Sequence, residues 1–193
     1  MQNLTLAATV LAAAALAACS STPSAPAGGP LGVAKLQPTA NNRASGTVWF
    51  AQEGDHVVVR GRVNGLTPNQ EHGFHVHERG DCSAPDAMSA GGHFNPTNKP
   101  HGAAHGSGEH HVGDLPSLKA DASGTAVANF QLPGVLLGSG AGDFMGKALV
   151  VHADPDDLRT QPSGNSGARI ACGVLMTPAG AGMGDVKSIP HEM

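Results

Sequence analysis

Glycine and proline interrupt this chain so often that it has no room for long helices. The 193 residues include 27 glycines and 14 prolines, and no segment keeps a helical spacing of apolar residues over a dozen positions. Charged residues make up only 13% of the chain, far fewer than a helical bundle normally carries. Short apolar runs between turn-forming residues are instead typical of an all-β sandwich or barrel.

The predicted strands are short apolar runs bounded by turn formers. They lie at residues 47–51, 56–60, 74–77, 125–130, 147–152 and 170–175. The first two flank Glu53-Gly54-Asp55, which predicts a hairpin. Two connections, at 78–116 and 153–168, are long, and connections of that length in a compact domain are usually functional.

The N-terminal stretch indicates export. Residues 4–18 are almost wholly apolar, but this run is shorter than the roughly 18–20 residues that cross a membrane as a helix. It ends in Leu16-Ala17-Ala18-Cys19, and a short apolar run that closes on small residues is typical of a secretory signal. Because a cysteine stands at the cleavage point, the segment resembles a bacterial lipoprotein signal in which Cys19 carries the lipid. The alternative is an ordinary signal that leaves a soluble periplasmic protein.

Composition divides the rest of the chain. Residues 20–31 are rich in serine, proline, alanine and glycine, which is typical of a flexible tether, and the C-terminal stretch has the same character. The expected segments are a signal peptide at 1–18, a lipid-anchor cysteine with a linker at 19–32, a folded domain at 33–176 and a flexible tail at 177–193. The domain would then face the periplasm and meet the membrane only through its lipid.

Charge and aromatic content exclude nucleic acid as a partner. The net charge is −4 with histidine neutral, so the chain has no basic footprint. Its aromatic residues are Trp49 and five phenylalanines, with no tyrosine, so stacking platforms for single strands are missing as well.

Histidine is unusually frequent, and its spacing points to a metal site. There are 11 histidines, as many as the lysines and arginines together, and most lie between residues 56 and 111. His75 and His77 share one face of a predicted strand, because successive side chains point to opposite faces. The next connection and a later strand end add His93, His101, His110, His111, Asp114 and His152. Such a set of imidazoles with one carboxylate suits zinc or copper.

Five motifs occur in an order that identifies a family. They are Gly73-Phe74-His75-Val76-His77-Glu78, Gly92-His93-Phe94-Asn95-Pro96, His111-Val112-Gly113-Asp114-Leu115-Pro116, Leu149-Val150-Val151-His152 and Gly167-Ala168-Arg169-Ile170-Ala171-Cys172-Gly173. Through these motifs the chain resembles the copper–zinc superoxide dismutases of the bacterial secreted type, and the resemblance extends over nearly all of 33–176. The resemblance implies an eight-stranded Greek-key β barrel or sandwich with two long functional loops.

The resemblance also implies two metal ions per subunit, one copper and one zinc. The implied copper ligands are His75, His77, His93 and His152. The implied zinc ligands are His93, His101, His111 and Asp114, with His93 bridging the two ions as imidazolate. Asp156 matches a carboxylate that links a copper histidine to a zinc histidine.

The implied activity converts two superoxide anions and two protons to O₂ and H₂O₂ by cycling copper between Cu(II) and Cu(I), which would protect the cell envelope. Arg169 would dock superoxide at the copper channel, and His93 would carry a proton. Cys82 and Cys172 would form a disulfide. The subunit would act as a monomer or a homodimer.

Two other hypotheses about the function remain open. One is a non-enzymatic copper and zinc protein that stores or delivers the ions, and the other is a degenerate structural relative. Storage needs no anion-docking arginine, and a degenerate relative would be expected to lose ligands, so Arg169 and the intact ligand set favour the enzyme. The remaining histidines His72, His105 and His110 are expected to be solvated loop residues.

Overall fold

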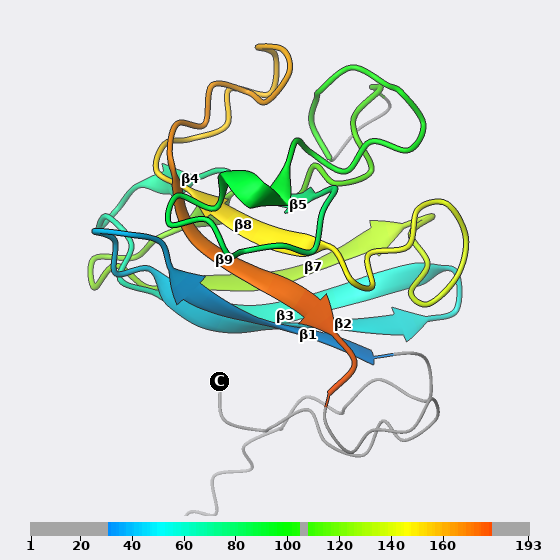
Figure 1. Cartoon of the computed structure of the whole chain (residues 1–193), viewed down its shortest axis with the longest axis horizontal. Helices are drawn as coiled ribbons and strands as arrows, with labels where there is room; N and C mark the ends of the chain where they lie inside the picture. The colour runs from blue at the N-terminus through cyan, green and yellow to red at the C-terminus, as the bar shows by residue number, and fades with distance from the viewer. Residues whose placement is uncertain (1–30, 105–107, 179–193) are drawn as a thin grey trace, which may run out of the picture.

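The computed structural model describes residues 31–104 and 108–178, and strands dominate this part of the chain (Figure 1). The strands are β1 Leu31–Pro38, β2 Ser45–Glu53, β3 His56–Asn64, β4 Glu71–His72, β5 Phe74–His77, β6 Leu118–Lys119, β7 Ala126–Pro133, β8 Ala148–His152 and β9 Arg169–Met176. One short 3-10 turn, η1, covers Met88–Ala90. The predicted signal peptide, Cys19 and most of the linker and tail lie outside the described residues.

The main sheet has seven antiparallel strands in the order β5-β8-β9-β1-β2-β3-β7, and β4 pairs separately with β6. The sheet curls, so that β5, β8 and β9 lie above β1, β2, β3 and β7 in Figure 1. The all-β prediction is confirmed. The predicted count of eight strands is not, because the described residues form this seven-stranded sheet and a two-residue pair beside it.

The predicted hairpin is confirmed by β2 and β3, which pair from Ser45↔Asn64 to Glu53↔His56. Gly54 in its turn has φ +60°, a left-handed backbone that glycine adopts without strain. Alternate residues of β3, such as Val57 and Val59, are completely buried in the core. Alternation therefore fixes which face of this hairpin packs inward.

Strand β1 is the main element that the sequence does not predict. It begins at Leu31, just before the predicted start of the domain, and it pairs with both β2 and β9. Ala34 and Leu36 are buried in the core, but Leu31 and Val33 on the other face are buried too. Because both faces are covered, the strand lacks the apolar and polar alternation that marks a half-exposed strand.

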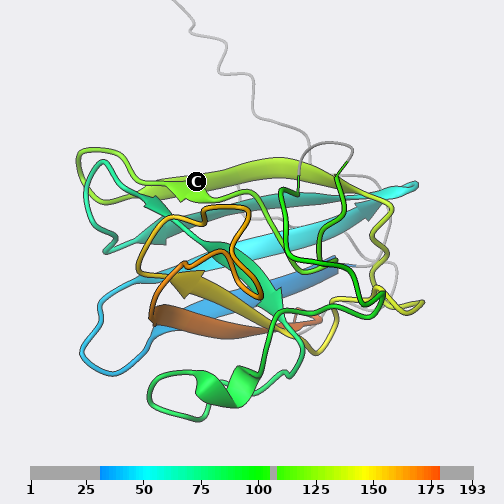
Figure 2. The ribbon, with the colours of Figure 1, turned by 90° about the horizontal axis from the view of Figure 1, so that it is seen from above.

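The core lies between the two layers of the curled sheet. Phe50, Phe74 and Phe144 are completely buried, and the rings of Phe50 and Phe144 meet edge to face at 6.1 Å. Phe74 and Val76 of β5 belong to this core, so their neighbours His75 and His77 point the other way. Seen from above, the connection 153–168 lies over β5 and β8, and the connection 78–116 runs beside them (Figure 2). The fold thus presents two histidines close to two long connections.

A disulfide ties one of these loops to the sheet. Cys82, in the connection 78–116, is bonded to Cys172 of β9, as the family resemblance implies. Cys172 packs with Ala87, Ala90 and Val150 in a small apolar cluster under the loop. The described residues contain no helix with the length and apolar character needed to cross a membrane.

Removing the disulfide is expected to lower stability. The bond closes a loop with a sequence separation of 90 residues, and loops of that size are worth about 4–5 kcal/mol in the chain-entropy model. We expect Cys82→Ser/Cys172→Ser to lose about this free energy of unfolding, measured by denaturant titration with a chelator present. A reductant should destabilise the wild type to the same extent and leave the double variant unchanged. An equal response of both proteins to reductant would contradict this role.

Candidate metal centre

Strand β5 supplies two candidate ligands, His75 and His77, and the connection 78–116 is hydrogen-bonded to this strand. The Val76 N–H donates to the Gly113 carbonyl at 2.8 Å, and the Val76 carbonyl accepts from the Phe94 N–H at 2.8 Å. These bonds bring the loop residues beside Phe94 and Gly113, His93 and Asp114, next to β5, where bridges also form between His77 and His93 and between His75 and Asp114. Residues far apart in the loop thus meet at one strand.

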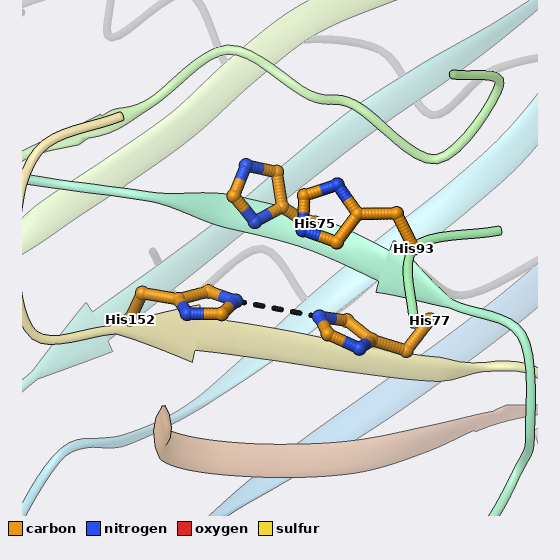
Figure 3. A group of neighbouring side chains, drawn as sticks. All are labelled: His75, His77, His93 and His152. Atoms are coloured by element: carbon orange, nitrogen blue, oxygen red, sulfur yellow. Dashed lines mark hydrogen bonds between the residues drawn. The ribbon is translucent and has the colours of Figure 1, made fainter. Parts of the chain in front are cut away.

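A second strand completes a group of four imidazoles. β8 pairs with β5, and an irregularity in the β8–β9 register falls between Val151 and His152, at the end of β8. His75, His77, His93 and His152 are buried, and each offers a ring nitrogen that lies within 4.8 Å of the others (Figure 3). We call this group the four-histidine cluster.

Three of these rings each have one nitrogen in a hydrogen bond with another group of the protein. The contacts are His75 Nε2 to Asp156 Oδ2 at 2.7 Å, His77 Nδ1 to the Gly91 carbonyl at 2.9 Å and His152 Nδ1 to the Gly167 carbonyl at 3.3 Å. The other nitrogens face a common space. Those of His77 and His152 are 3.3 Å apart, while His75 Nδ1 and His93 Nε2 are buried with no hydrogen-bond partner among the described residues.

Burial keeps three rings of this cluster, those of His75, His77 and His152, uncharged. It lowers the pKa of His75 to about 4 and that of His152 to about 3, and it holds the pKa of His77 well below its ordinary value. Neighbouring imidazoles act in the same direction on all three rings. At neutral pH these three rings are therefore neutral and each carries a free lone pair, which is the form that binds a metal.

The second group, which we call the His3Asp cluster, gathers around one carboxylate. Asp114 Oδ1 lies 2.8 Å from His93 Nδ1, 3.0 Å from His101 Nδ1 and 3.4 Å from His111 Nδ1. The other oxygen, Oδ2, accepts the backbone N–H groups of His111 at 2.9 Å and Gly102 at 3.1 Å. Burial alone would raise the pKa of Asp114, but hydrogen bonds from His101 and His93 hold it well below its ordinary value.

Asp156 links the two clusters, because it contacts one ring of each. Its Oδ2 lies 2.7 Å from His75 Nε2 and its Oδ1 lies 2.9 Å from His101 Nε2. Burial would raise the pKa of Asp156, yet these hydrogen bonds hold it well below its ordinary value. Burial also works against a charged His101, but its contacts with Asp114 and Asp156 raise its pKa to about 9.

His93 belongs to both clusters, because its ring presents one nitrogen to each. Nδ1 lies near Asp114 and 3.4 Å from His111 Nδ1, while the buried Nε2 belongs with the four-histidine cluster. Buried polar atoms without partners are costly, and a bound metal ion would satisfy them. Four imidazoles suit copper, and three imidazoles with a carboxylate suit zinc. Both donor sets therefore fit the implied ions.

A guanidinium lies beside the four-histidine cluster. Arg169 pairs with His152 across β8 and β9, and it donates to the Ala87 carbonyl at 2.7 Å and to the Gly91 carbonyl at 2.6 Å. The Gly91 carbonyl also accepts from His77, so one backbone oxygen holds both groups. The sequence gives no signal for this use of Gly91, because the contact involves only its backbone.

One prediction about the additional histidines is wrong. His72 is completely buried rather than solvated, and its Nδ1 donates to the His152 carbonyl at 2.8 Å. It is covered because β4 pairs with β6, and because the Gly73 carbonyl next to it accepts the His152 N–H at 2.8 Å. His110 is half-buried and donates to the His111 carbonyl at 2.7 Å, while His105 lies outside the described residues.

Known proteins are similar to this chain in sequence. A family model described as copper/zinc superoxide dismutase matches residues 44–175. "Superoxide dismutase [Cu-Zn] 2" of Aquifex aeolicus is 43% identical over 123 residues, which cover 62% of this chain and 71% of the relative. "Superoxide dismutase-like protein YojM" of Bacillus subtilis is 46% identical over 118 residues, covering 59% of this chain and 60% of the relative.

A solved structure has a similar fold. The crystal structure of the clock protein EA4 superposes with a TM-score of 0.69 and 34% identity, covering 80% of this chain and 96% of that protein. The family match spans both clusters, the disulfide and Arg169. This chain therefore belongs to the copper/zinc superoxide dismutase family.

Proposed function

We propose that this protein is an exported superoxide dismutase that converts two superoxide anions and two protons to O₂ and H₂O₂. The observation that carries the proposal is the pair of buried donor sets that share His93, with the Arg169 guanidinium beside one of them. The four-histidine cluster would hold copper and the His3Asp cluster zinc, one of each per subunit. Bound copper supplies one-electron redox chemistry, whereas zinc has none and orders the ligands around it.

The chain's own residues would bind the anion and supply a proton. Arg169 has five N–H donors, and two carbonyls hold its guanidinium in place, so the remaining donors can dock a small anion. Among the described residues His93 Nε2 has no hydrogen-bond partner, so this nitrogen would be the one to take up a proton while Nδ1 serves the His3Asp cluster. Asp156, which contacts His75 and His101, would keep both rings in their orientations.

Family membership alone does not decide the activity, because the relatives include a protein named superoxide dismutase-like and one described as a clock protein. A storage or delivery protein would need the ligands but not a guanidinium held at the Gly91 carbonyl. The deciding experiment is dismutase activity of the copper- and zinc-loaded protein, measured beside its metal content. Both ions bound without activity would favour storage.

The shared imidazole makes a specific prediction. We expect His93→Ala to weaken the binding of both ions, each by more than the roughly 10–100-fold that loss of a residue outside the ligand set typically costs. Asp114→Ala should weaken zinc binding while most copper stays bound, because Asp114 belongs only to the His3Asp cluster. Chelator competition followed by metal analysis measures both affinities.

A distant histidine provides the matched control for this experiment. His56, at the turn between β2 and β3, should tolerate alanine with no change in either affinity. If His93→Ala lost only copper, the assignment of His93 to both ions would be wrong.

The guanidinium makes a second prediction. Arg169→Ile should lower dismutase activity by about tenfold or more while both metals and the disulfide stay in place, since local charge raises the arrival rate of small ions by about 10–1,000-fold. Lysine at this position should restore part of the rate, because it keeps the charge and loses the planar fork. Added salt should slow the wild type more than the isoleucine variant, because screening removes an attraction that the variant lacks.

Arg62 on β3 is the control for loss of one positive charge. Arg62→Ile should retain the wild-type rate and salt dependence, because this exposed side chain lies on a strand that carries none of the cluster residues. Full activity of Arg169→Ile at low salt, with both metals bound, would show that another group docks the anion.

We also propose that the protein is a lipoprotein whose domain faces the periplasm. The support is the apolar segment 4–18 that ends in Leu16-Ala17-Ala18-Cys19. Cys19→Ala should release the protein from the membrane fraction or block its processing, and mass spectrometry of the N-terminal peptide should find the lipid in the wild type. If the wild-type protein instead begins just before or just after Cys19 and carries no lipid, the lipoprotein proposal is wrong and the soluble periplasmic alternative holds.

A further inference from the structure

One side chain of the connection 153–168 holds the backbone of a residue in the His3Asp cluster. The Gln161 Oε1 accepts the His101 N–H at 2.8 Å, and the Gln161 Nε2 donates to the His101 carbonyl at 3.0 Å. A primary amide carries an acceptor and a donor side by side, which matches the N–H and C=O of one residue. The contact joins two segments that lie 60 residues apart in the sequence.

We propose that Gln161 is a positioning residue that sets the zinc affinity of the His3Asp cluster through the backbone of His101. This inference rests on the proposed assignment of zinc to that cluster. The hydrogen bonds of the Gln161 side chain go to backbone groups and not to a ring nitrogen. It would therefore act by fixing the backbone position from which the His101 side chain extends.

The backbone of His101 depends on this contact. His101 is buried, it lies outside any strand, and no backbone group in residues 31–104 or 108–178 is hydrogen-bonded to its N–H or carbonyl. A buried peptide group without a partner loses its hydration and receives nothing in return. Without Gln161, the local backbone would therefore shift toward water or toward another partner and carry the imidazole with it.

Gln161 itself is held in one orientation. Its Nε2 donates a second time, to the Arg159 carbonyl at 3.2 Å, so both amide hydrogens are used. The turn around it is closed by the Asp157 carboxylate, which accepts the N–H groups of Arg159 at 2.9 Å and Thr160 at 2.8 Å. The side chain is thus presented by a preformed turn.

The same connection also holds the far side of the His101 ring. Asp156 contacts His101 Nε2 at 2.9 Å, and a Cβ added to Gly164 would lie only 2.6 Å from that nitrogen. Asp156 therefore fixes the ring at Nε2, where the glycine at 164 leaves room for this contact, and Gln161 fixes the backbone of His101. Between these two points, Nδ1 is aimed at Asp114, 3.0 Å away.

The test is Gln161→Met, which keeps the length of the side chain and removes both hydrogen bonds. We expect zinc affinity of the metal-free full chain to fall about tenfold, the lower end of the loss that residues outside a ligand set typically cause. Zinc ion in competition with a chromophoric chelator measures this affinity. Cu(I) affinity, measured with a copper-selective chelator, should stay the same, because His101 belongs only to the His3Asp cluster.

Gln70 provides a matched control. Its Nε2 donates to the Ala153 carbonyl at 2.9 Å, so Gln70→Met also removes a glutamine contact to backbone, but at a residue outside the His3Asp cluster. Zinc affinity should not change. Gln161→Glu separates hydrogen bonding from charge. It loses the donor and adds a negative charge, so we expect weaker zinc binding, whereas a purely electrostatic role would make binding tighter.

Three outcomes would overturn the proposal. Unchanged zinc affinity in Gln161→Met is the first. The second is an equal loss of zinc and copper affinity together with lower stability of the metal-free protein, which would mark a general structural role. The third is tighter zinc binding in Gln161→Glu. If the wild type itself bound zinc no better than Asp114→Ala, the proposed zinc site would fail instead, and the two failures are distinguishable.

Discussion

The site depends on the fact that each imidazole has two nitrogens, and that the protein occupies one so that the other must face the shared space. Asp156 holds His75 at Nε2, and the Gly91 carbonyl holds His77 at Nδ1. Each bond fixes the tautomer and the orientation of its ring before any ion arrives. His93 differs because the group at its Nδ1, Asp114, is itself a member of the His3Asp cluster, while its Nε2 has no hydrogen-bond partner among the described residues. One ring therefore belongs to both clusters.

Sharing of partners then couples groups that come from distant parts of the chain. Asp156 touches one ring of each cluster, so a shift of the connection 153–168 would disturb both together. The Gly91 carbonyl accepts from both His77 and Arg169. The disulfide from Cys82 fixes the loop that carries this carbonyl. The position of the guanidinium therefore depends on the covalent bond as well as on β9.

Most of the strands and the pair of His75 and His77 leave local patterns in the sequence, whereas the full membership of the two clusters was implied by the family resemblance. Apolar runs between turn formers mark β2, β3 and β5, and a histidine at every second position marks a shared face. Strand β1 leaves no such pattern, since residues on both of its faces are buried. His72 was misplaced for a similar reason: its burial comes from contacts with β6 and with His152, 80 residues away. Gly91 acts through its own carbonyl, and Gln161 acts through contacts with the backbone of His101, 60 residues away, so neither leaves a local pattern in the sequence.

The strands contribute only part of the site, and the rest comes from one long connection that bonds to the sheet at a few points. His75, His77 and His152 lie on β5 and β8, whereas His93, His101, His111 and Asp114 lie in one connection. Fixing each loop residue in one conformation costs conformational entropy, and specific contacts must offset this cost. Here the loop is held by hydrogen bonds to the Val76 backbone and to the Asp114 and Asp156 carboxylates. The hydrogen bonds of Gln161 to the backbone of His101 hold it as well. Geometry in the His3Asp cluster should therefore be more sensitive to remote polar side chains than geometry in the four-histidine cluster.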